Sequence, residues 1–401
     1  MSQVRHSNRW RSVANFLVAN FVHITAGALG VLLVSFLLWS VARPYITPGT
    51  DFKIAMDQGL YLDGISYVVG NLVKDWDRKR SVWLKQHEQM MVGVGGGRAS
   101  MVVVTGSQPQ PCENPIGDHL LLRSLKNKVD YCRIHGYDVF YNNVLLQPKM
   151  SECWAKLPAI RAAMLSHPEA EWVLWVDADA LFTDMEFEFP FDRYENHNLV
   201  VEGWGTYQRR SFTSLNAGVF LIRNCQWSMD FMEAWASMGP QSPEYAKWGR
   251  IQQSVIKDKL HPDSDDQSAL LYLMLEERAK WGDKIFLEQE VSFQSHWVGV
   301  TNRLSNFSRA QLEEDRKSGG RKRNAEKVTR GYGAQTDRLP IMIHFAGCQP
   351  CSGKHNPAYG AESCWEGMNQ ALAFADNQVL RNFGLAHLNL SESAVSAITH
   401  I

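Results

Sequence analysis

The sequence predicts an α/β domain with a mostly parallel sheet, preceded by a single N-terminal membrane-spanning helix. Three observations support this prediction. From residue 101 onward, strand patterns and helix patterns alternate along the chain, as they do in βαβ units. Residues 21–41 form one long apolar run. Asp177 and Asp179 directly follow the apolar run 172–176, and ligands of open α/β sheets bind beyond such strand ends.

The composition allows one large domain with accessory segments and argues against nucleic acid as a partner. The chain has 401 residues, and 45% of them are apolar, which is enough for a core of domain size. Its formal net charge is -1, whereas nucleic-acid-binding proteins carry a basic excess. Seven cysteines are ordinary for this length and do not indicate a disulfide-rich miniprotein.

Residues 21–41 are predicted to cross a membrane once, as an uncleaved signal anchor. The run contains no Asp, Glu, Lys or Arg, and a helix of this length spans about 30 Å, the thickness of the hydrocarbon core. Arg5, Arg9 and Arg11 precede it without an acidic residue, so the positive-inside rule places the N-terminus in the cytoplasm. A cleaved signal peptide is the alternative, but its apolar region would be shorter and followed by a small-residue cleavage site.

This topology divides the chain into a cytoplasmic tail (1–20), the anchor, a lumenal stem (42–98) and a globular domain (99–401). The stem is expected to end in the run GVGGGR, because glycine-rich runs are flexible breaks. Two sequons agree with a lumenal domain and predict N-glycans at Asn306 and Asn389.

The elements of the globular domain follow from local patterns. The β-branched run MVVVTG predicts the first strand. An amphipathic helix follows it and ends at Gly136, which can cap it in the left-handed conformation. Pro158 suits the first turn of the next helix. Strands are predicted at 101–106, 137–142, 172–176, 198–201, 216–224, 284–288 and 339–345, and helices at 118–136, 158–167, 226–237 and 266–281.

Asp177 and Asp179 are predicted to hold a divalent metal ion. A buried carboxylate is costly unless it is paired or coordinates a metal, and carboxylate oxygens suit Mg²⁺ or Mn²⁺. His344 ends the apolar run IMIH and is the candidate third ligand, which shifts the preference towards Mn²⁺. The alternatives are a helix cap or solvated loop for the aspartates and a packed core position for the histidine. The presence of both motifs in one chain favours the metal site.

Asp265 and Asp266 stand at the start of the helix predicted at 266–281. Acidic residues at this place cap a helix and suit its dipole, which is the structural interpretation. In the functional interpretation they place a carboxylate at the reacting centre.

Cys348 and Cys351 form a Cys-x-x-Cys pair, a spacing that also occurs in zinc and redox sites. Because a second such pair is missing and the domain is expected in the lumen, a structural disulfide is favoured. Cys364 and Cys112 are both candidate partners, and the spacing does not choose between them.

The motifs together resemble a known family. The runs TGSQPQPCENPIGDHLLLRSLKNKVDYCRIHG, WAKLPAIR, WVDADALFTDM, LNAGVFLIRN, DDQSA and HFAGCQPC follow one another in this order. The set is similar to glycosyltransferase family 34, the plant group that contains xyloglucan xylosyltransferases and galactomannan galactosyltransferases. The resemblance covers residues 101–385, apart from the stretch at about 300–335.

The resemblance implies a GT-A fold, in which a Rossmann-like nucleotide-binding sandwich merges with an acceptor region. It implies a type II Golgi membrane protein that uses a UDP-sugar and Mn²⁺. Such an enzyme transfers galactose or xylose, with retention, as an α-1,6 side residue onto the β-1,4-linked hemicellulose backbone of xyloglucan or galactomannan. The partners would be a hemicellulose oligosaccharide, the Golgi membrane and other subunits of a homo- or hetero-oligomer.

Site residues are carried over where this sequence matches the family motifs. By resemblance, the metal ligands are Asp177, Asp179 and His344. The residues that match the catalytic loop are Asp265, Asp266 and Gln267, and those that match the nucleotide pocket and the donor-sugar site are Thr105, Gly106, Ser107, Lys156, Asn216 and Gly218.

Gln349 and Glu202 depart from the family pattern. Gln349 stands where a lysine would pair with the diphosphate, and a neutral donor is about half as strong as a charged one. Lys354 is the candidate replacement, so both residues are assigned to the donor site. Glu202 stands where a histidine is expected. These departures support the alternative of a catalytically weak or non-catalytic scaffold partner in a Golgi polysaccharide-synthesis complex. Trp204 and Trp297 are candidates for stacking on sugar faces, with core packing as the alternative for each.

Overall fold

The computed structural model describes the globular part of the chain. Every described residue belongs to one compact unit, Ile65–Ile401. The predicted cytoplasmic tail and membrane span lie outside the described residues. No helix in the part that the structure describes is long and apolar enough to cross a membrane. The described ranges are 67–88, 100–259, 261–318, 340–354 and 361–398.

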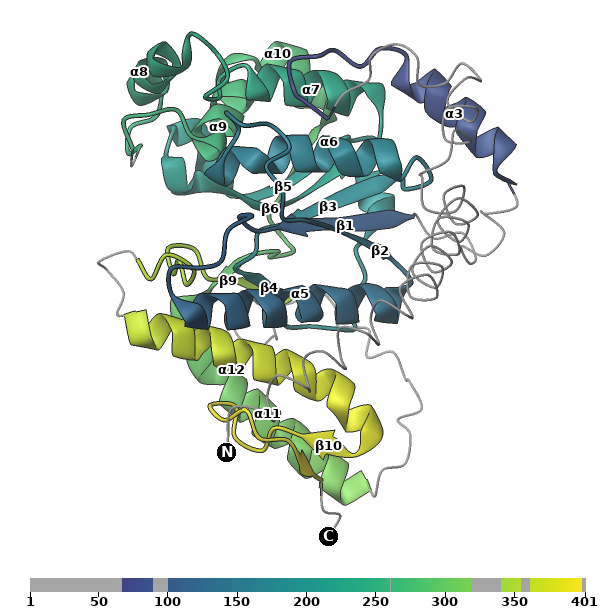
Figure 1. Cartoon of the computed structure of the whole chain (residues 1–401), viewed down its shortest axis with the longest axis vertical. Coiled ribbons are helices and arrows are strands. Elements are labelled where there is room, and N and C mark those ends of the chain that lie inside the picture. The colour runs from purple at the N-terminus through teal and green to yellow at the C-terminus, as the bar shows by residue number, and fades with distance from the viewer. Residues whose placement is uncertain (1–66, 89–99, 260, 319–339, 355–360, 399–401) are drawn as a thin grey trace, which may run out of the picture. The chain divides into compact units, whose positions relative to one another are not determined.

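A six-stranded sheet with the order β2-β1-β3-β6-β5-β7 forms the centre of this unit (Figure 1). Five strands run in the same direction and β6 runs against them, so the prediction of a mostly parallel sheet is confirmed. The strands are β1 (Met101–Gly106), β2 (Asp138–Asn142), β3 (Trp172–Val176), β5 (Leu199–Gly203), β6 (Leu215–Arg223) and β7 (Ile285–Glu288).

The reversed strand β6 determines which residues gather at one edge of the sheet. It pairs with β3 in an antiparallel register that sets Val219 opposite Val176. The residues that open β6 therefore lie beside the carboxyl end of β3, which Asp177 follows. Strand β1 is parallel to β3, so Thr105 and Gly106 end at the same edge.

Helices cover both faces of the sheet. Helices α6, α7 and α9 lie on one face, and α5 lies on the other with α12 packed outside it (Figure 1). Helix α5 begins after Asn114, whose side chain accepts a hydrogen bond from Ile116 N, and it ends at Gly136 with a φ of 71°, as predicted. The helix predicted at 266–281 is broken at Glu277. The helices are α3 (Trp76–Gln86), α5 (Pro115–His135), α6 (Lys156–Ser166), α7 (Gln226–Ala236), α8 (Tyr245–Val255), α9 (Asp266–Glu276), α10 (Arg278–Trp281), α11 (Thr301–Ser318) and α12 (Ala361–Leu380).

A second sheet carries His344 to the edge where β3 ends. It has three strands in the order β4-β9-β8, namely β4 (Ala180–Phe182), β9 (Met342–His344) and β8 (Ser295–His296). Ala180 pairs with His344. Because Ala180 follows Asp179 directly, this pairing places the end of β9 beside the Asp-x-Asp turn.

The end of the predicted stem packs on the globular domain. Val69, Val73 and Trp76 are buried in the largest hydrophobic cluster, together with core residues of the sheet and its helices. The indole Nε1 of Trp76 donates a hydrogen bond of 2.7 Å to Oδ1 of the buried Asn224. Residues 67–88 therefore belong to the same compact unit as the sheet and its helices.

Each cysteine of the Cys-x-x-Cys pair is bonded to a different one of the two candidate partners. Cys351 is bonded to Cys112, just before α5, and Cys348 is bonded to Cys364 in α12. The structural disulfide is confirmed, and both open alternatives for its partner are realised. The two bonds tie the turn that follows His344 to the helices on one face of the sheet.

Candidate metal and donor site

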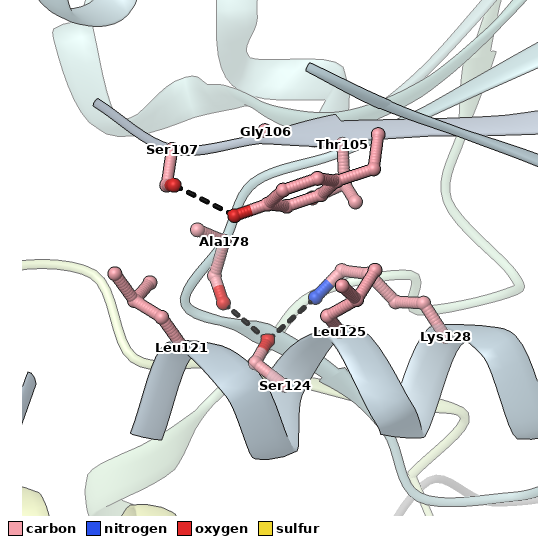
Figure 2. Close-up of a pocket in the computed structure, with 9 residues that line it drawn as sticks. Thr105, Gly106, Ser107, Leu121, Ser124, Leu125, Lys128 and Ala178 are labelled. Carbon is pink, nitrogen blue, oxygen red and sulfur yellow. Dashed lines mark hydrogen bonds between the residues drawn. The ribbon is translucent and has the colours of Figure 1, made fainter. Parts of the chain in front are cut away.

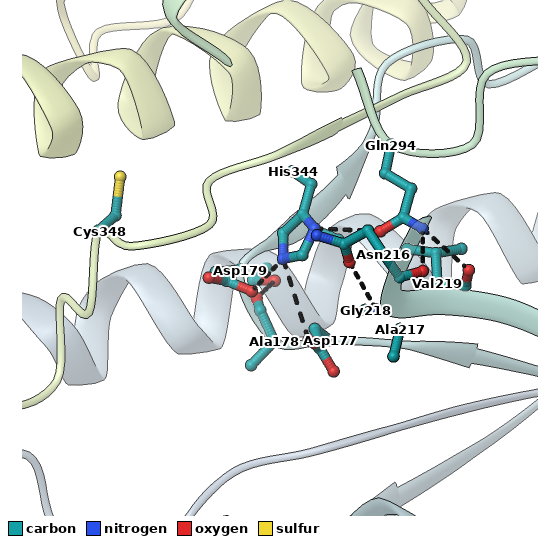
Figure 3. Close-up of polar contacts among 12 residues, drawn as sticks. Asp177, Ala178, Asp179, Asn216, Ala217, Gly218, Val219, Gln294, His344 and Cys348 are labelled. Atoms are coloured by element: carbon teal, nitrogen blue, oxygen red, sulfur yellow. Dashed lines mark hydrogen bonds and ion pairs between the residues drawn. The ribbon is translucent and has the colours of Figure 1, made fainter. Parts of the chain in front are cut away.

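Asp177, Asp179 and His344 come together at the edge of the sheet (Figure 3). Their ligand atoms all lie within 4.8 Å of one another. His344 Nε2 lies 3.2 Å from Asp179 Oδ1 and 3.9 Å from Asp177 Oδ2. The structure thus gathers the three predicted metal ligands, and a set of two carboxylates and one imidazole fits a divalent ion such as Mn²⁺.

The charges of this group favour a bound cation. Burial raises the pKa of Asp177, with Lys156 opposing and Asp179 adding to this effect. Burial also raises the pKa of Asp179, but the charge of His344 and its hydrogen bond lower it more, so the pKa of Asp179 lies below its usual value. Burial lowers the pKa of His344, but Asp179 raises it more, so the net shift is upward. Two carboxylates so close together in a largely buried place need positive charge beside them.

Asp177 is fixed by its neighbours so that one oxygen faces His344. The indole Nε1 of Trp175 donates to Asp177 Oδ1 at 2.6 Å, and Lys156 Nζ lies 3.5 Å from the same oxygen. The backbone N of Asp177 donates to Gly218 O at 2.8 Å. These contacts leave Asp177 Oδ2 on the side of the imidazole.

The turn that opens β6 is shaped by a glycine and by side-chain hydrogen bonds. A Cβ on Gly218 would stand 2.3 Å from His344 Cε1 and 2.9 Å from Asp177 Oδ2, so this position has no room for a side chain. Asn216 Oδ1 accepts a hydrogen bond from Gly218 N at 2.7 Å. Gln267 Oε1 accepts one from Ala217 N at 3.2 Å. The predicted residues Asn216, Gly218 and Gln267 therefore belong to one arrangement beside the metal ligands.

Lys156 and Asp266 form a buried ion pair next to this turn. Their charged atoms are 2.6 Å apart, and the two side chains are 4% and 8% exposed. Lys156 Nζ also donates to Ala217 O at 2.8 Å. Burial lowers the pKa of Lys156, but Asp177 and Asp266 raise it more, so that the amine stays charged. Lys156 thus links the carboxylate of Asp177 to the first turn of α9.

Asp265 is engaged as the cap of α9. Its Oδ1 accepts a hydrogen bond from Ser268 N at 2.7 Å, and its Oδ2 lies 2.5 Å from Lys259 Nζ. These are the contacts that the structural interpretation of the acidic pair describes. A role of Asp265 or Asp266 at the reacting centre stays a prediction.

A small pocket lies between the end of β1 and the middle of α5 (Figure 2). Ser107 Oγ and the Tyr141 hydroxyl oxygen are 2.7 Å apart across it. A Cβ on Gly106 would stand 2.3 Å from Asn142 O, so β1 and β2 approach closely here. The predicted nucleotide-pocket residues Thr105, Gly106 and Ser107 all line this pocket, together with Leu121, Ser124, Leu125, Lys128, Tyr141 and Ala178.

Ser124 and Lys128 connect this pocket to the Asp-x-Asp turn, and sequence reasoning missed both. Ser124 Oγ donates to Ala178 O at 2.5 Å, and Lys128 Nζ donates to Ser124 Oγ at 2.7 Å and to Ala180 O at 2.8 Å. Burial lowers the pKa of Lys128 to about 7, against the raising effect of Asp179. The available signal was a pair of polar residues four positions apart in a helix, which places them on one face.

Gln349 and Lys354 lie on an exposed turn after β9. Gln349 has a φ of 39°, in the left-handed region, and both side chains are exposed. Among the described residues, neither side chain makes a hydrogen bond or ion pair with Asp177, Asp179 or His344. Their assignment to the diphosphate stays a prediction.

Comparison with known families decides the class of the protein. Residues 97–355 match the model of the galactosyl transferase GMA12/MNN10 family. The chain belongs to this family, glycosyltransferase family 34. The resemblance drawn from the sequence motifs is confirmed.

Relatives with assigned names support the same class. The chain is 54% identical to galactomannan galactosyltransferase 1 of Cyamopsis tetragonoloba. The 344 aligned residues cover 83% of this chain and 78% of that protein. It is 50% identical to glycosyltransferase 6 of Arabidopsis thaliana. The 371 aligned residues cover 88% of this chain and 85% of that protein. The family 34 chain is therefore a glycosyltransferase.

The solved structures are more distant. A glycosyltransferase involved in the glycosylation of the major capsid of PBCV-1 is 12% identical, covers 67% of this chain and 98% of its own, and has a TM-score of 0.39.

Proposed function

We propose that this family 34 chain transfers galactose or xylose from a UDP-sugar, with retention, as an α-1,6 side residue onto a β-1,4-linked hemicellulose backbone. The observation that carries the proposal is the convergence of Asp177, Asp179 and His344 beside the pocket at the end of β1. The similarity to a protein named as a galactomannan galactosyltransferase supports the substrate class. The six-stranded sheet and its helices take the role of the GT-A nucleotide-binding sandwich.

The residues of the site fit Mn²⁺ as the bound cation. Asp177, Asp179 and His344 would hold it, and it would supply charge stabilisation for the departing UDP. The other contributions come from the chain itself. Trp175 and Lys156 hold the Asp177 carboxylate in place, and the pocket beside Thr105 and Ser107 suits part of the nucleotide.

The acceptor would lie at the end of β5, where Trp204 follows. Strand β5 lies next to β6 and runs in the direction of β3, so Trp204 belongs to the same edge of the sheet as Asp177. Trp204 is 54% exposed, whereas Trp297 is 5% exposed and packs with Phe345. Of the two candidate tryptophans, Trp204 alone has a free face for a sugar ring.

The proposed setting is the Golgi lumen, with residues 21–41 as a type II signal anchor. The two disulfides suit an oxidising compartment, because cytosolic proteins rarely keep disulfides. The Asn389 side chain is exposed in a turn, and its Oδ1 accepts a hydrogen bond from Ser391 N. Asn306 is also exposed, but it lies within α11 and its sequon residue Ser308 is buried. We therefore favour Asn389 as the glycosylated site.

One assay tests the transfer reaction. The purified full-length chain is offered UDP-galactose, UDP-xylose and UDP-glucose with Mn²⁺, against mannan and glucan oligosaccharides. The expected product carries an α-1,6-linked sugar, identified by NMR. Asp179→Asn serves as the matched variant and should lower turnover at least ~100-fold, because the metal contributes several kcal/mol of charge stabilisation. The absence of UDP release with every acceptor would favour the scaffold alternative. Transfer unaffected by a chelator would contradict the metal role of Asp177, Asp179 and His344.

A further inference from the structure

Gln294 joins the metal site to the central sheet. It directly precedes β8, and its amide nitrogen Nε2 donates to two backbone carbonyls, Asn216 O at 2.8 Å and Val219 O at 3.2 Å. Its amide oxygen Oε1 lies 3.1 Å from His344 Nδ1 (Figure 3). Since carbonyl oxygens only accept hydrogen bonds, the two carbonyls fix which end of the amide is the nitrogen.

This orientation of Gln294 determines where His344 carries its proton. The amide oxygen can only accept, so Nδ1 of the imidazole must be the protonated nitrogen that donates to it. Nε2 is the nitrogen that faces Asp177 and Asp179. In metal sites, the hydrogen bond on one ring nitrogen fixes the tautomer and the ring orientation that present the other nitrogen to the metal.

Gln294 is itself held by Glu202 of β5. The backbone N of Gln294 donates to Glu202 Oε2 at 2.7 Å, and Ser292 Oγ donates to Glu202 Oε1 at 2.8 Å. The Gln294 side chain is therefore hydrogen-bonded to two backbone carbonyls of β6, and its backbone N–H is hydrogen-bonded to a side chain of β5. Two strands of the sheet thus fix the position from which the amide oxygen reaches His344.

We propose that Gln294 is a positioning residue that holds His344 in the orientation and tautomer needed to bind the cation, with Glu202 as its anchor. The inference rests on the metal site of the proposed function. It adds a residue that is not among the predicted site residues, and it assigns a role to Glu202, the glutamate that departs from the family pattern.

A double-mutant cycle on cation binding tests the proposal without using the transfer reaction. The affinity of the full-length chain for Mn²⁺ alone is measured by electron paramagnetic resonance of the unbound ion. The four proteins are the wild type, Gln294→Leu, His344→Ala and the double variant. Gln294→Leu should weaken Mn²⁺ binding by about 10- to 100-fold, as the loss of an outer-shell partner does. In the His344→Ala background the same change should have no further effect, because Gln294 acts through the imidazole.

Gln378→Leu is the matched control. Gln378 also holds two backbone groups, with Oε1 accepting from Met185 N and Nε2 donating to Thr183 O, but it does not touch a metal ligand. It should leave Mn²⁺ affinity unchanged. Equal losses from Gln294→Leu in both backgrounds, or no loss in either, would overturn the proposal. If the coupling is found but no sugar is transferred, the proposed function fails and the role of Gln294 stands. A wild type that binds no Mn²⁺ overturns both.

Discussion

Gly218 shows at the scale of a single residue how little room the site leaves. A Cβ at this position would overlap with His344 Cε1 and crowd Asp177 Oδ2. We expect Gly218→Ala to reduce Mn²⁺ affinity more than tenfold, because the imidazole must move. Overpacking should lower the free energy of unfolding by about 1–3 kcal/mol.

Calorimetric titration with Mn²⁺ and a thermal melt measure the two effects. Gly299→Ala is the control, because a Cβ there meets nothing within 4 Å. Unchanged Mn²⁺ affinity in Gly218→Ala would contradict the placement of His344 against this glycine.

The ion pair of Lys156 and Asp266 makes a second prediction at this scale. Both side chains are almost completely buried, and removal of one partner of a buried pair leaves an uncompensated charge. Lys156→Met should therefore lower the free energy of unfolding by about 3–5 kcal/mol.

The double variant Lys156→Met/Asp266→Leu should regain part of that loss, since the buried Asp266 carboxylate is gone and only that of Asp177 remains. Denaturant unfolding of the three proteins measures this. A double variant less stable than Lys156→Met alone would contradict this expectation, because it would show that the Asp266 carboxylate stabilises the fold through an interaction other than the one with Lys156.

Glu202 makes stability depend on pH. Burial raises its pKa from 4.5 to about 7, although hydrogen bonds from Ser292 and Gln294 lower it. Between these two values the unfolded chain has lost the proton that the folded chain keeps, so the free energy of unfolding falls as pH rises from about 4.5 to 7. At ~1.4 kcal/mol per pKa unit, the loss from this group is at most about 3.5 kcal/mol.

Glu202→Gln should remove this part of the pH dependence. The amide oxygen can still accept from Gln294 N, and the amide nitrogen can donate to Ser292 Oγ. Relative to the wild type, the variant should gain stability between pH 5 and pH 8. Parallel stability curves for the two proteins over this range would contradict the raised pKa.

At the scale of elements, the sequence predicted the strands better than the contacts between them. The strand 172–176 has the predicted bounds, because a run of buried apolar residues is a local signal. His344 was found because it ends such a run. Gln294 was missed, since its partner lies 50 residues away and no local pattern marks a residue that bonds across two sheets.

The helices show the same limit. Helix α5 was predicted together with its stop at Gly136, because a left-handed glycine cap is a local feature. Helices α11 and α12 were not predicted. They pack on each other, and α12 also packs on α5. Contacts between segments so far apart in the sequence leave no local sequence pattern. The cysteine partners were likewise left open, because disulfide pairing depends on which segments the fold brings together.

The assembly of the whole unit depends on the segment that the sequence assigned to the stem. Val69 and Val73 are buried, and so is Trp76. Full burial of each such side chain contributes about 1.5–3 kcal/mol. Without the segment, Gln147 would also lose its two hydrogen bonds to Val69, and Asn224 the one from Trp76. Together these contributions approach the 5–15 kcal/mol that stabilise a typical domain.

A fragment that begins at residue 65 should therefore fold cooperatively, whereas one that begins at residue 99 should aggregate or melt at a much lower temperature. Gel filtration and thermal melts of the two fragments compare them directly. Trp76→Ala in the longer fragment is the matched variant, and it should lower the free energy of unfolding by about 3–5 kcal/mol. The segment bonds to Arg161 of α6 and to Gln226 and Glu233 of α7, and none of these residues is a metal ligand. The variant should therefore keep the Mn²⁺ affinity of the longer fragment below its melting temperature. A shorter fragment that is soluble and melts at the same temperature would show that the compact unit starts at the predicted boundary after all, and that the segment only rests on its surface.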